Sequence, residues 1–161
     1  MVAQPSMSAR QTRNVEMWRA VSYLADLPDP VIAEVAILAT HRVYAGGETV
    51  FLEGDPCAGL FLVEAGSVKI CRFGKDGRQH VVHVVYPVET FNEVAVLDGG
   101  VNPACTIAIE ESHLWRVTRF ELQSLAQRYP MLAWALGESI ARRSRLLMNK
   151  VQDLSMRNVR G

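Results

Sequence analysis

The stretch LFLVEAGSVKI, residues 60–70, consists of two short apolar runs on either side of Gly66. Runs of this kind, rich in β-branched and aromatic side chains, are typical of strands. Similar runs cover residues 49–52, 60–64, 67–72, 81–86, 106–109 and 113–118. Glycines recur between the first of these runs, and Asp76-Gly77 supplies the positive φ angles of a tight hairpin turn. The pattern predicts an antiparallel barrel or sandwich.

Apolar residues at helical spacing flank this segment on both sides. Before it, residues 15–24 and 30–41 are expected to form two short helices. After it, residues 120–128 predict another short helix, and a longer helical pattern runs from 130 to about 160 with no internal proline. The polar segment 1–14 is expected to be a flexible tail.

The long C-terminal pattern carries two apolar stripes. The steps of the first alternate between four and three residues, the a/d spacing of a heptad: Ala133, Gly137, Ile140, Ser144, Leu147, Val151, Leu154 and Asn158. The second lies beside it: Leu132, Leu136, Leu146 and Met148. One stripe would cover the barrel and the other would meet a partner helix, so we expect a homodimer. The predicted interface is Ile140, Ser144, Leu147, Val151 and Leu154. A monomeric helix packed along its own domain is the alternative.

The bulk composition limits the classes of function. Lys+Arg and Asp+Glu both number 17, so no net charge attracts the chain to nucleic acid or lipid. The three cysteines, Cys57, Cys71 and Cys105, form no CxxC pair, which argues against a disulfide framework or a zinc site and favours a cytosolic compartment. No apolar run approaches the roughly 18 residues of a membrane span, so no membrane association is expected.

Several short motifs, in their order and spacing, resemble the cyclic-nucleotide-binding domain of the CRP/FNR superfamily of bacterial transcription regulators. They are FLEGDP (51–56), LFLVEAGSVKI (60–70), DGR (76–78), FNEV (91–94), the glycine pair 99–100 and IARR (140–143). The resemblance spans residues 24–160. It implies an α+β, mainly β fold: a double-stranded antiparallel β-helix (jelly roll or β-roll) with N-terminal helices and a long C-terminal dimerisation helix.

The resemblance also implies the domain organisation and the function. We expect a flexible tail (1–14), a β-roll sensor domain with flanking helices (15–129) and a dimerisation helix (130–161). The chain would be the ligand-sensing and dimerisation part of a regulator, not an enzyme. It would bind DNA only through a helix-turn-helix domain that is not in this sequence. A stand-alone protein-interaction module is the alternative.

In that family, the glutamate of a Gly-Glu pair contacts the ribose, and an Arg-Ser or Arg-Thr about ten residues later holds the cyclic phosphate. Here Glu93 is present, but Asn92 replaces the glycine, and Pro103 and Ala104 stand where the arginine and serine would be. Proline has neither charge nor N–H, so it cannot bind a phosphate. We therefore expect no tight binding of cyclic AMP or cyclic GMP, and interpret Glu93 as a carboxylate at a helix start.

The effector pocket that the resemblance implies would include apolar residues of the long helix where relatives place polar residues beside the adenine. Its candidate residues are Asn92, Glu93, Val94, Ala95, Pro103, Ala104, Cys105, Leu147 and Met148. The neighbours of Cys105 carry no positive charge that would activate its thiol, so a buried structural role is favoured.

No cofactor and no metal site are expected, and the effector is left open. The first 56 residues contain no cysteine, which excludes an N-terminal iron–sulfur cluster. His80 and His83 are an odd number of residues apart, so on a strand they would face opposite sides and could not bind one metal together. A haem or gas sensor remains an alternative function. No catalytic motif is found, and Arg142, Arg143 and Arg145 are interpreted as a solvated or partner-facing cluster.

Overall fold

The computed structural model describes residues 5–159. The strands are β1 (Thr40–Tyr44), β2 (Thr49–Phe51), β3 (Leu60–Ala65), β4 (Val68–Phe73), β5 (Gln79–Val85), β6 (Thr90–Phe91), β7 (Cys105–Ala108) and β8 (Ser112–Val117). The helices are α1 (Pro5–Arg19), the 3₁₀ turn η1 (Ser22–Leu24), α2 (Asp29–Leu38), α3 (Glu93–Asp98), α4 (Arg119–Arg128) and α5 (Pro130–Val159).

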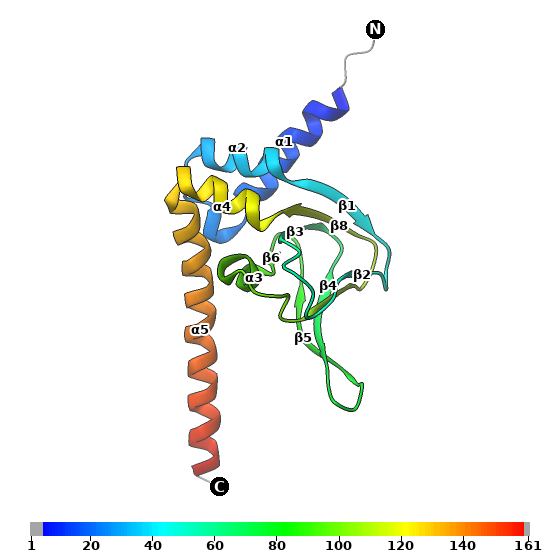
Figure 1. Cartoon of the computed structure of the whole chain (residues 1–161), viewed down its shortest axis with the longest axis vertical. Helices are drawn as coiled ribbons and strands as arrows, with labels where there is room; N and C mark the ends of the chain where they lie inside the picture. Colours follow the sequence, from blue (N-terminus) through cyan, green and yellow to red (C-terminus); the bar gives the residue numbers. More distant parts are fainter. Residues whose placement is uncertain (1–4, 160–161) are drawn as a thin grey trace.

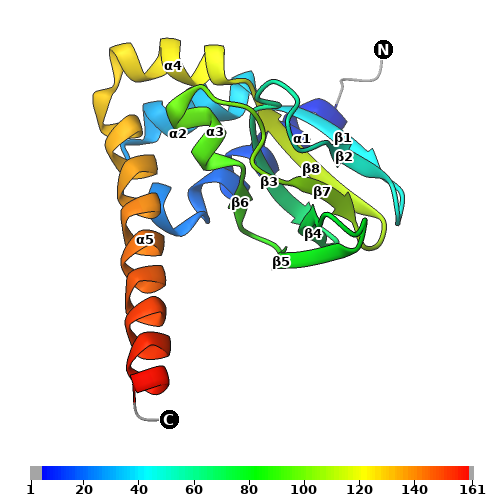
Figure 2. The ribbon, with the colours of Figure 1, turned by 60° about the horizontal axis from the view of Figure 1, so that its bottom comes forward.

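The strands form two antiparallel four-stranded sheets, β1-β8-β3-β6 and β2-β7-β4-β5, which face each other (Figure 2). Side chains alternate along β3: Phe61 and Val63 point into the roll, whereas Leu60 and Leu62 point toward the helices. Gly66 makes the β3–β4 turn with φ +85°, and a Cβ there would lie 2.4 Å from the carbonyl oxygen of Glu111. The expected mainly β, antiparallel β-roll with N-terminal helices and a long C-terminal helix is confirmed.

A second core joins the helices to the outer face of the β1-β8-β3-β6 sheet. Trp18 of α1, Ile32 of α2 and Leu125 of α4 are almost completely buried in it. Helix α1 differs from the flexible tail that the polar composition of residues 1–14 indicated. The amide of Asn14 donates a hydrogen bond to the carbonyl oxygen of Ala36 at 2.6 Å, so tertiary contacts hold this polar segment in a helix. Residues 1–4 lie outside the described part.

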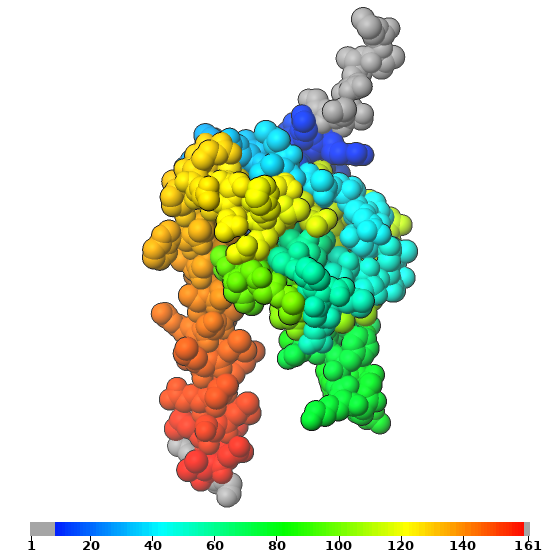
Figure 3. Space-filling view, in the orientation of Figure 1, coloured from blue at the N-terminus to red at the C-terminus, as the bar shows by residue number. Residues whose placement is uncertain are grey.

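The buried residues of α5 are confined to its first ten positions. Leu132, Leu136 and Ser139 are buried there, whereas every residue from Ala141 to Val159 is exposed. The helix therefore extends away from the β-roll, as Figures 1 and 3 show. Among the described residues, no helix is both long and apolar enough to cross a membrane.

Candidate effector site

The short helix α3 begins at Asn92, whose backbone has φ +76° and ψ +24°. Asparagine adopts this left-handed conformation at lower cost than most side chains, which explains how it can stand where the resemblance implied a glycine. Its side-chain amide also donates to the carbonyl oxygen of Gly59 at 3.0 Å and to Oδ1 of Asn102 at 3.1 Å. The replacement of glycine therefore adds contacts to the site.

Asn102, only 1% exposed, extends this network on the other side of the site. Its Oδ1 accepts a hydrogen bond from the backbone N–H of Ala58 at 3.0 Å, and its Nδ2 donates to the carbonyl oxygen of Leu52 at 3.1 Å. The two amides thus connect the start of α3, the β2–β3 loop and the segment before β7. A buried polar network with its partners in place fixes a single local conformation.

Glu93, at the first position of α3, is 2% exposed and points toward α5. Arg143 approaches both carboxylate oxygens, with Nη1 3.1 Å from Oε2 and Nη2 3.3 Å from Oε1. The hydroxyl of Thr90 donates to Oε1 at 2.6 Å. Glu93 thus stands at the start of a helix, as expected, and it also pairs with Arg143, which is not merely solvated or partner-facing.

Tyr23 closes the same site from the N-terminal side. Its hydroxyl forms a hydrogen bond with Oγ1 of Thr90, the group that donates to Glu93. Burial raises the pKa of the Tyr23 phenol, and the nearby Glu93 carboxylate raises it further. The phenol therefore stays protonated as part of a chain that runs from Tyr23 through Thr90 and Glu93 to Arg143.

The segment that would hold a cyclic phosphate offers mainly apolar groups. Pro103 is exposed, whereas Ala104 and Cys105 are 6% and 4% exposed. The Cys105 thiol accepts a hydrogen bond from the backbone N–H of Glu53 at 3.3 Å. Cys105 lies opposite Cys71 in the β4–β7 register; both are free thiols, and burial raises the pKa of Cys71.

The two helix residues predicted to line the pocket do not approach this segment within the single chain. Leu147 and Met148 are 61% and 68% exposed and follow Arg143 on the free part of α5. With Val151, they line a shallow apolar hollow on the helix itself. In α3, Ala95 is fully buried, whereas Val94 is 44% exposed. The structure therefore buries Asn92, Glu93, Ala95, Ala104 and Cys105 and leaves Val94, Pro103, Leu147 and Met148 exposed.

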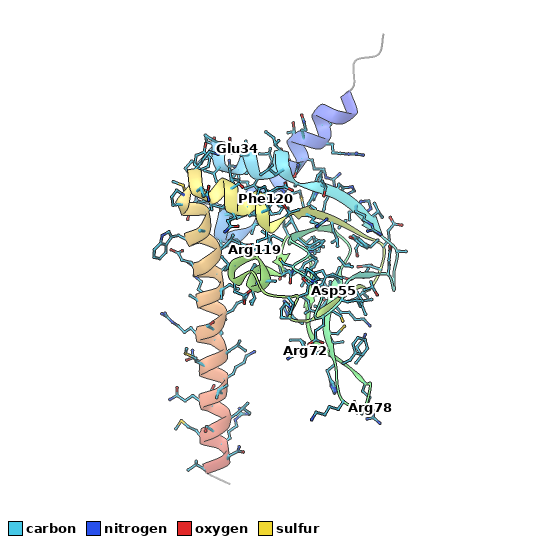
Figure 4. The ribbon with its side chains drawn as sticks, viewed as in Figure 1. Glu34, Asp55, Arg72, Arg78, Arg119 and Phe120 are labelled. Carbon is cyan, nitrogen blue, oxygen red and sulfur yellow. The ribbon has the colours of Figure 1, made fainter. Side chains whose placement is uncertain are left out.

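His80 and His83, weighed as haem ligands, lie on the exposed β5 strand of the hairpin whose tip carries Arg78 (Figure 4). The inference that they face opposite sides is wrong. The β4–β5 register is irregular next to His83, so His80 lies opposite Arg72 and His83 opposite Ile70, two residues of one face. Within residues 5–159, neither histidine belongs to a group of three possible metal ligands.

Residues 41–129, more than half of the chain, match the family model of the cyclic nucleotide-binding domain. The chain belongs to this family. This cyclic nucleotide-binding domain is 32% identical over 105 residues to the cyclic AMP receptor protein of Thermus thermophilus. The aligned residues cover 65% of this chain and 49% of the relative. It is also 32% identical over 115 residues to the CRP-like cAMP-activated global transcriptional regulator of Mycobacterium tuberculosis, with coverage of 71% and 51%.

The chain thus spans about half the length of these curated relatives. The N-terminal domain of a transcriptional regulator from Streptomyces coelicolor has the same fold, with a TM-score of 0.70 and 32% identity, and covers 84% of this chain and 94% of that structure. The homologues and structural neighbours of this cyclic nucleotide-binding domain include CRP/FNR-like regulators, as the motifs of the sequence implied.

Sequence reasoning found Glu93 but missed its partners Thr90 and Arg143, the hydrogen bond of Tyr23 to Thr90, and Asn102 as the partner of Asn92. Arg143 belongs to the IARR motif that carried part of the resemblance, so a signal for it was present. The other partners are ordinary polar residues, and only the fold of this cyclic nucleotide-binding domain brings them to the site.

Proposed function

We propose that this chain is the sensory and dimerisation part of a CRP/FNR-like transcription regulator whose effector is not cyclic AMP or cyclic GMP. The main support is the set of contacts made by Glu93, the residue at the ribose-binding position of the family motif that this chain keeps. Both of its oxygens are engaged by Arg143, and Thr90 binds one of them as well. The site is thus satisfied by groups of the chain itself.

The chemistry of the phosphate position supports the same proposal. A buried phosphate loses its hydration, and an arginine fork together with backbone N–H groups must replace that hydration. Pro103 provides neither charge nor N–H, and Ala104 has no hydroxyl. The residues present at this site therefore do not fit a cyclic nucleotide, although the fold is the one that binds such ligands in relatives.

The output proposed for this domain runs through α5. Its exposed residues Leu147, Val151 and Leu154 continue the heptad stripe well beyond the turns that pack on the domain. We propose that this stripe packs against the same helix of a second copy of the chain. In a whole regulator, such a homodimer would align two DNA-binding domains.

Signal transfer in this proposal is a population shift between two arrangements of α5. The Glu93–Arg143 ion pair joins the sensor site to the point where α5 leaves the domain. An effector that favours the state with this pair broken would release α5, and one that favours the paired state would hold it.

Isothermal titration calorimetry with cyclic AMP and cyclic GMP tests the proposal. We expect no binding at micromolar concentrations for the natural chain. The double variant Pro103→Arg/Ala104→Ser restores the phosphate-binding residue types and is expected to bind more tightly than the natural chain. Micromolar affinity of the natural chain would refute the proposal, and a double variant no better than the natural chain would show that another feature excludes the nucleotide.

A further inference from the structure

Three side chains with metal-binding atoms meet on the face of the β1-β8-β3 strands that is turned toward the helices. They are His41 on β1, His113 on β8 and Glu64 on β3. Nε2 of His41 lies 3.3 Å from Nδ1 of His113, and Oε2 of Glu64 lies 3.6 Å from the first nitrogen and 4.0 Å from the second. The effector site and its ion pair use none of these residues.

The three atoms have the spacing of ligands around one small cation. A point equidistant from them lies about 2.1 Å from each, which is the bond length of zinc to imidazole nitrogen and carboxylate oxygen. Two ligands 2.1 Å from a tetrahedral zinc ion are separated by about 3.4 Å, close to the observed nitrogen–nitrogen distance. An ion would therefore need only small side-chain adjustments.

A second set of residues orients the ligands. The other ring nitrogen of His113, Nε2, lies 3.4 Å from Oε1 of Glu111, which favours the tautomer with a free lone pair on Nδ1. The second oxygen of Glu64, Oε1, contacts Nε of Arg13 at 3.3 Å and Nε1 of Trp115 at 3.5 Å. Oε2 is therefore the oxygen left to face the two histidines.

The local fold and burial also suit a metal. The β3–β8 register is irregular between Val63 and Ala65, at Glu64, and such bulges often redirect a side chain at a functional site. The ring of His41 packs against Trp115, with 4.9 Å between centroids. The side chains of His41 and Glu64 are 21% and 9% exposed, so both lie largely under the neighbouring elements.

We propose that His41, Glu64 and His113 bind one divalent transition-metal ion, zinc in the first instance, with water in the fourth position. Two imidazoles and one carboxylate suit zinc and its transition-metal neighbours, whereas calcium and magnesium prefer sites made of oxygen atoms. Arg13 belongs to α1, so the ion would lie where α1 meets the sheet. The site is independent of the proposed function and adds a second ligand to this fold.

The test is calorimetric titration of the full chain, free of any polyhistidine tag, with Zn²⁺, followed by the visible absorption spectrum with Co²⁺. We expect one ion per chain and the intense spectrum of four-coordinate cobalt. His41→Ala and His113→Ala should each abolish this binding. The control His80→Ala/His83→Ala removes two exposed histidines of β5 and should leave stoichiometry and affinity unchanged.

Glu111→Gln separates metal binding from folding, because Glu111 is 73% exposed at its side chain and is not itself a ligand. We expect this variant to keep the natural circular dichroism spectrum and to lose about 10-fold to 100-fold in zinc affinity. Three results would each overturn the proposal: no zinc binding by the natural chain, unchanged binding in folded His113→Ala, or loss of binding in the β5 control.

Discussion

Glu93 and Arg143, fifty residues apart in the sequence, form an ion pair in which each guanidinium nitrogen Nη1 and Nη2 approaches one carboxylate oxygen, at 3.1 and 3.3 Å. Glu93 is 2% exposed at its side chain, whereas Arg143 is 49% exposed. The pair therefore joins a buried charge of the sensor site to a half-exposed one on α5. The pair matters most for Glu93, because its buried carboxylate is shielded from solvent.

Replacement of Arg143 by alanine is expected to lower the free energy of unfolding by about 2 kcal/mol, because the buried Glu93 side chain would lose its cationic partner. Arg142→Ala is the matched control: its side chain is exposed on the same helix, and a change below about 0.5 kcal/mol is expected. Urea denaturation followed by circular dichroism measures both. Equal effects of the two substitutions would contradict the role assigned to the pair.

The double variant Leu147→Glu/Val151→Glu is expected to turn a dimer into a monomer, because four like charges would meet in the heptad seam of two helices. Sedimentation equilibrium gives the mass. Asn149→Glu/Met156→Glu adds the same charge at exposed positions outside the a/d stripe and should leave the dimer intact. An unchanged mass of the first variant would disprove the stripe as an interface.

Asn92 offers a paired test of backbone and side-chain effects. Asn92→Gly keeps the left-handed conformation but loses the bonds to Gly59 and Asn102, whereas Asn92→Ala loses the same bonds and strains the backbone. The free energy of unfolding of the Asn92→Ala variant should therefore be about 1 kcal/mol lower than that of the Asn92→Gly variant. Thermal unfolding ranks the two variants, and the reverse order would mean that the φ angle does not limit this position.

The cysteines should react with iodoacetamide in an order set by burial. Cys71 and Cys105 are buried, and desolvation raises the pKa of Cys71, so little reactive thiolate forms there. Cys57 is only half-buried and should be alkylated first. Mass spectrometry of the native protein should find one modified cysteine at early times and three after unfolding in urea. Early modification of Cys71 would contradict the packing of β4.

The sequence predicted those elements whose signal is local. Strands next to Gly66 and Gly77 followed from glycine spacing, and α5 followed from its heptad pattern and lack of proline. Helix α1 was missed because its residues are polar, and a contact such as that of Asn14 with α2 has no local signature. Strand β1 was missed because THRVY, residues 40–44, has few apolar side chains.

The features of the candidate site also fall into those that the sequence alone predicts and those that depend on the fold. Pro103 in place of an arginine is visible in the sequence, because the residue type alone decides whether a phosphate can be bound. The pairing of Glu93 with Arg143, and the meeting of His41 with His113, depend on which face of a helix or strand each side chain takes. The bulge beside His83 shows how one inserted residue reverses such a prediction.

The exposed part of α5 is long enough for a small tilt near Arg143 to move its far end by several ångströms. Sixteen residues separate Arg143 from Val159, which is about 24 Å at 1.5 Å per residue. A tilt of about 10° at Arg143 would displace the end of the helix sideways by about 4 Å. In the proposed homodimer, a change in the Glu93–Arg143 contact that tilted α5 in this way would alter how the far ends of the two helices meet.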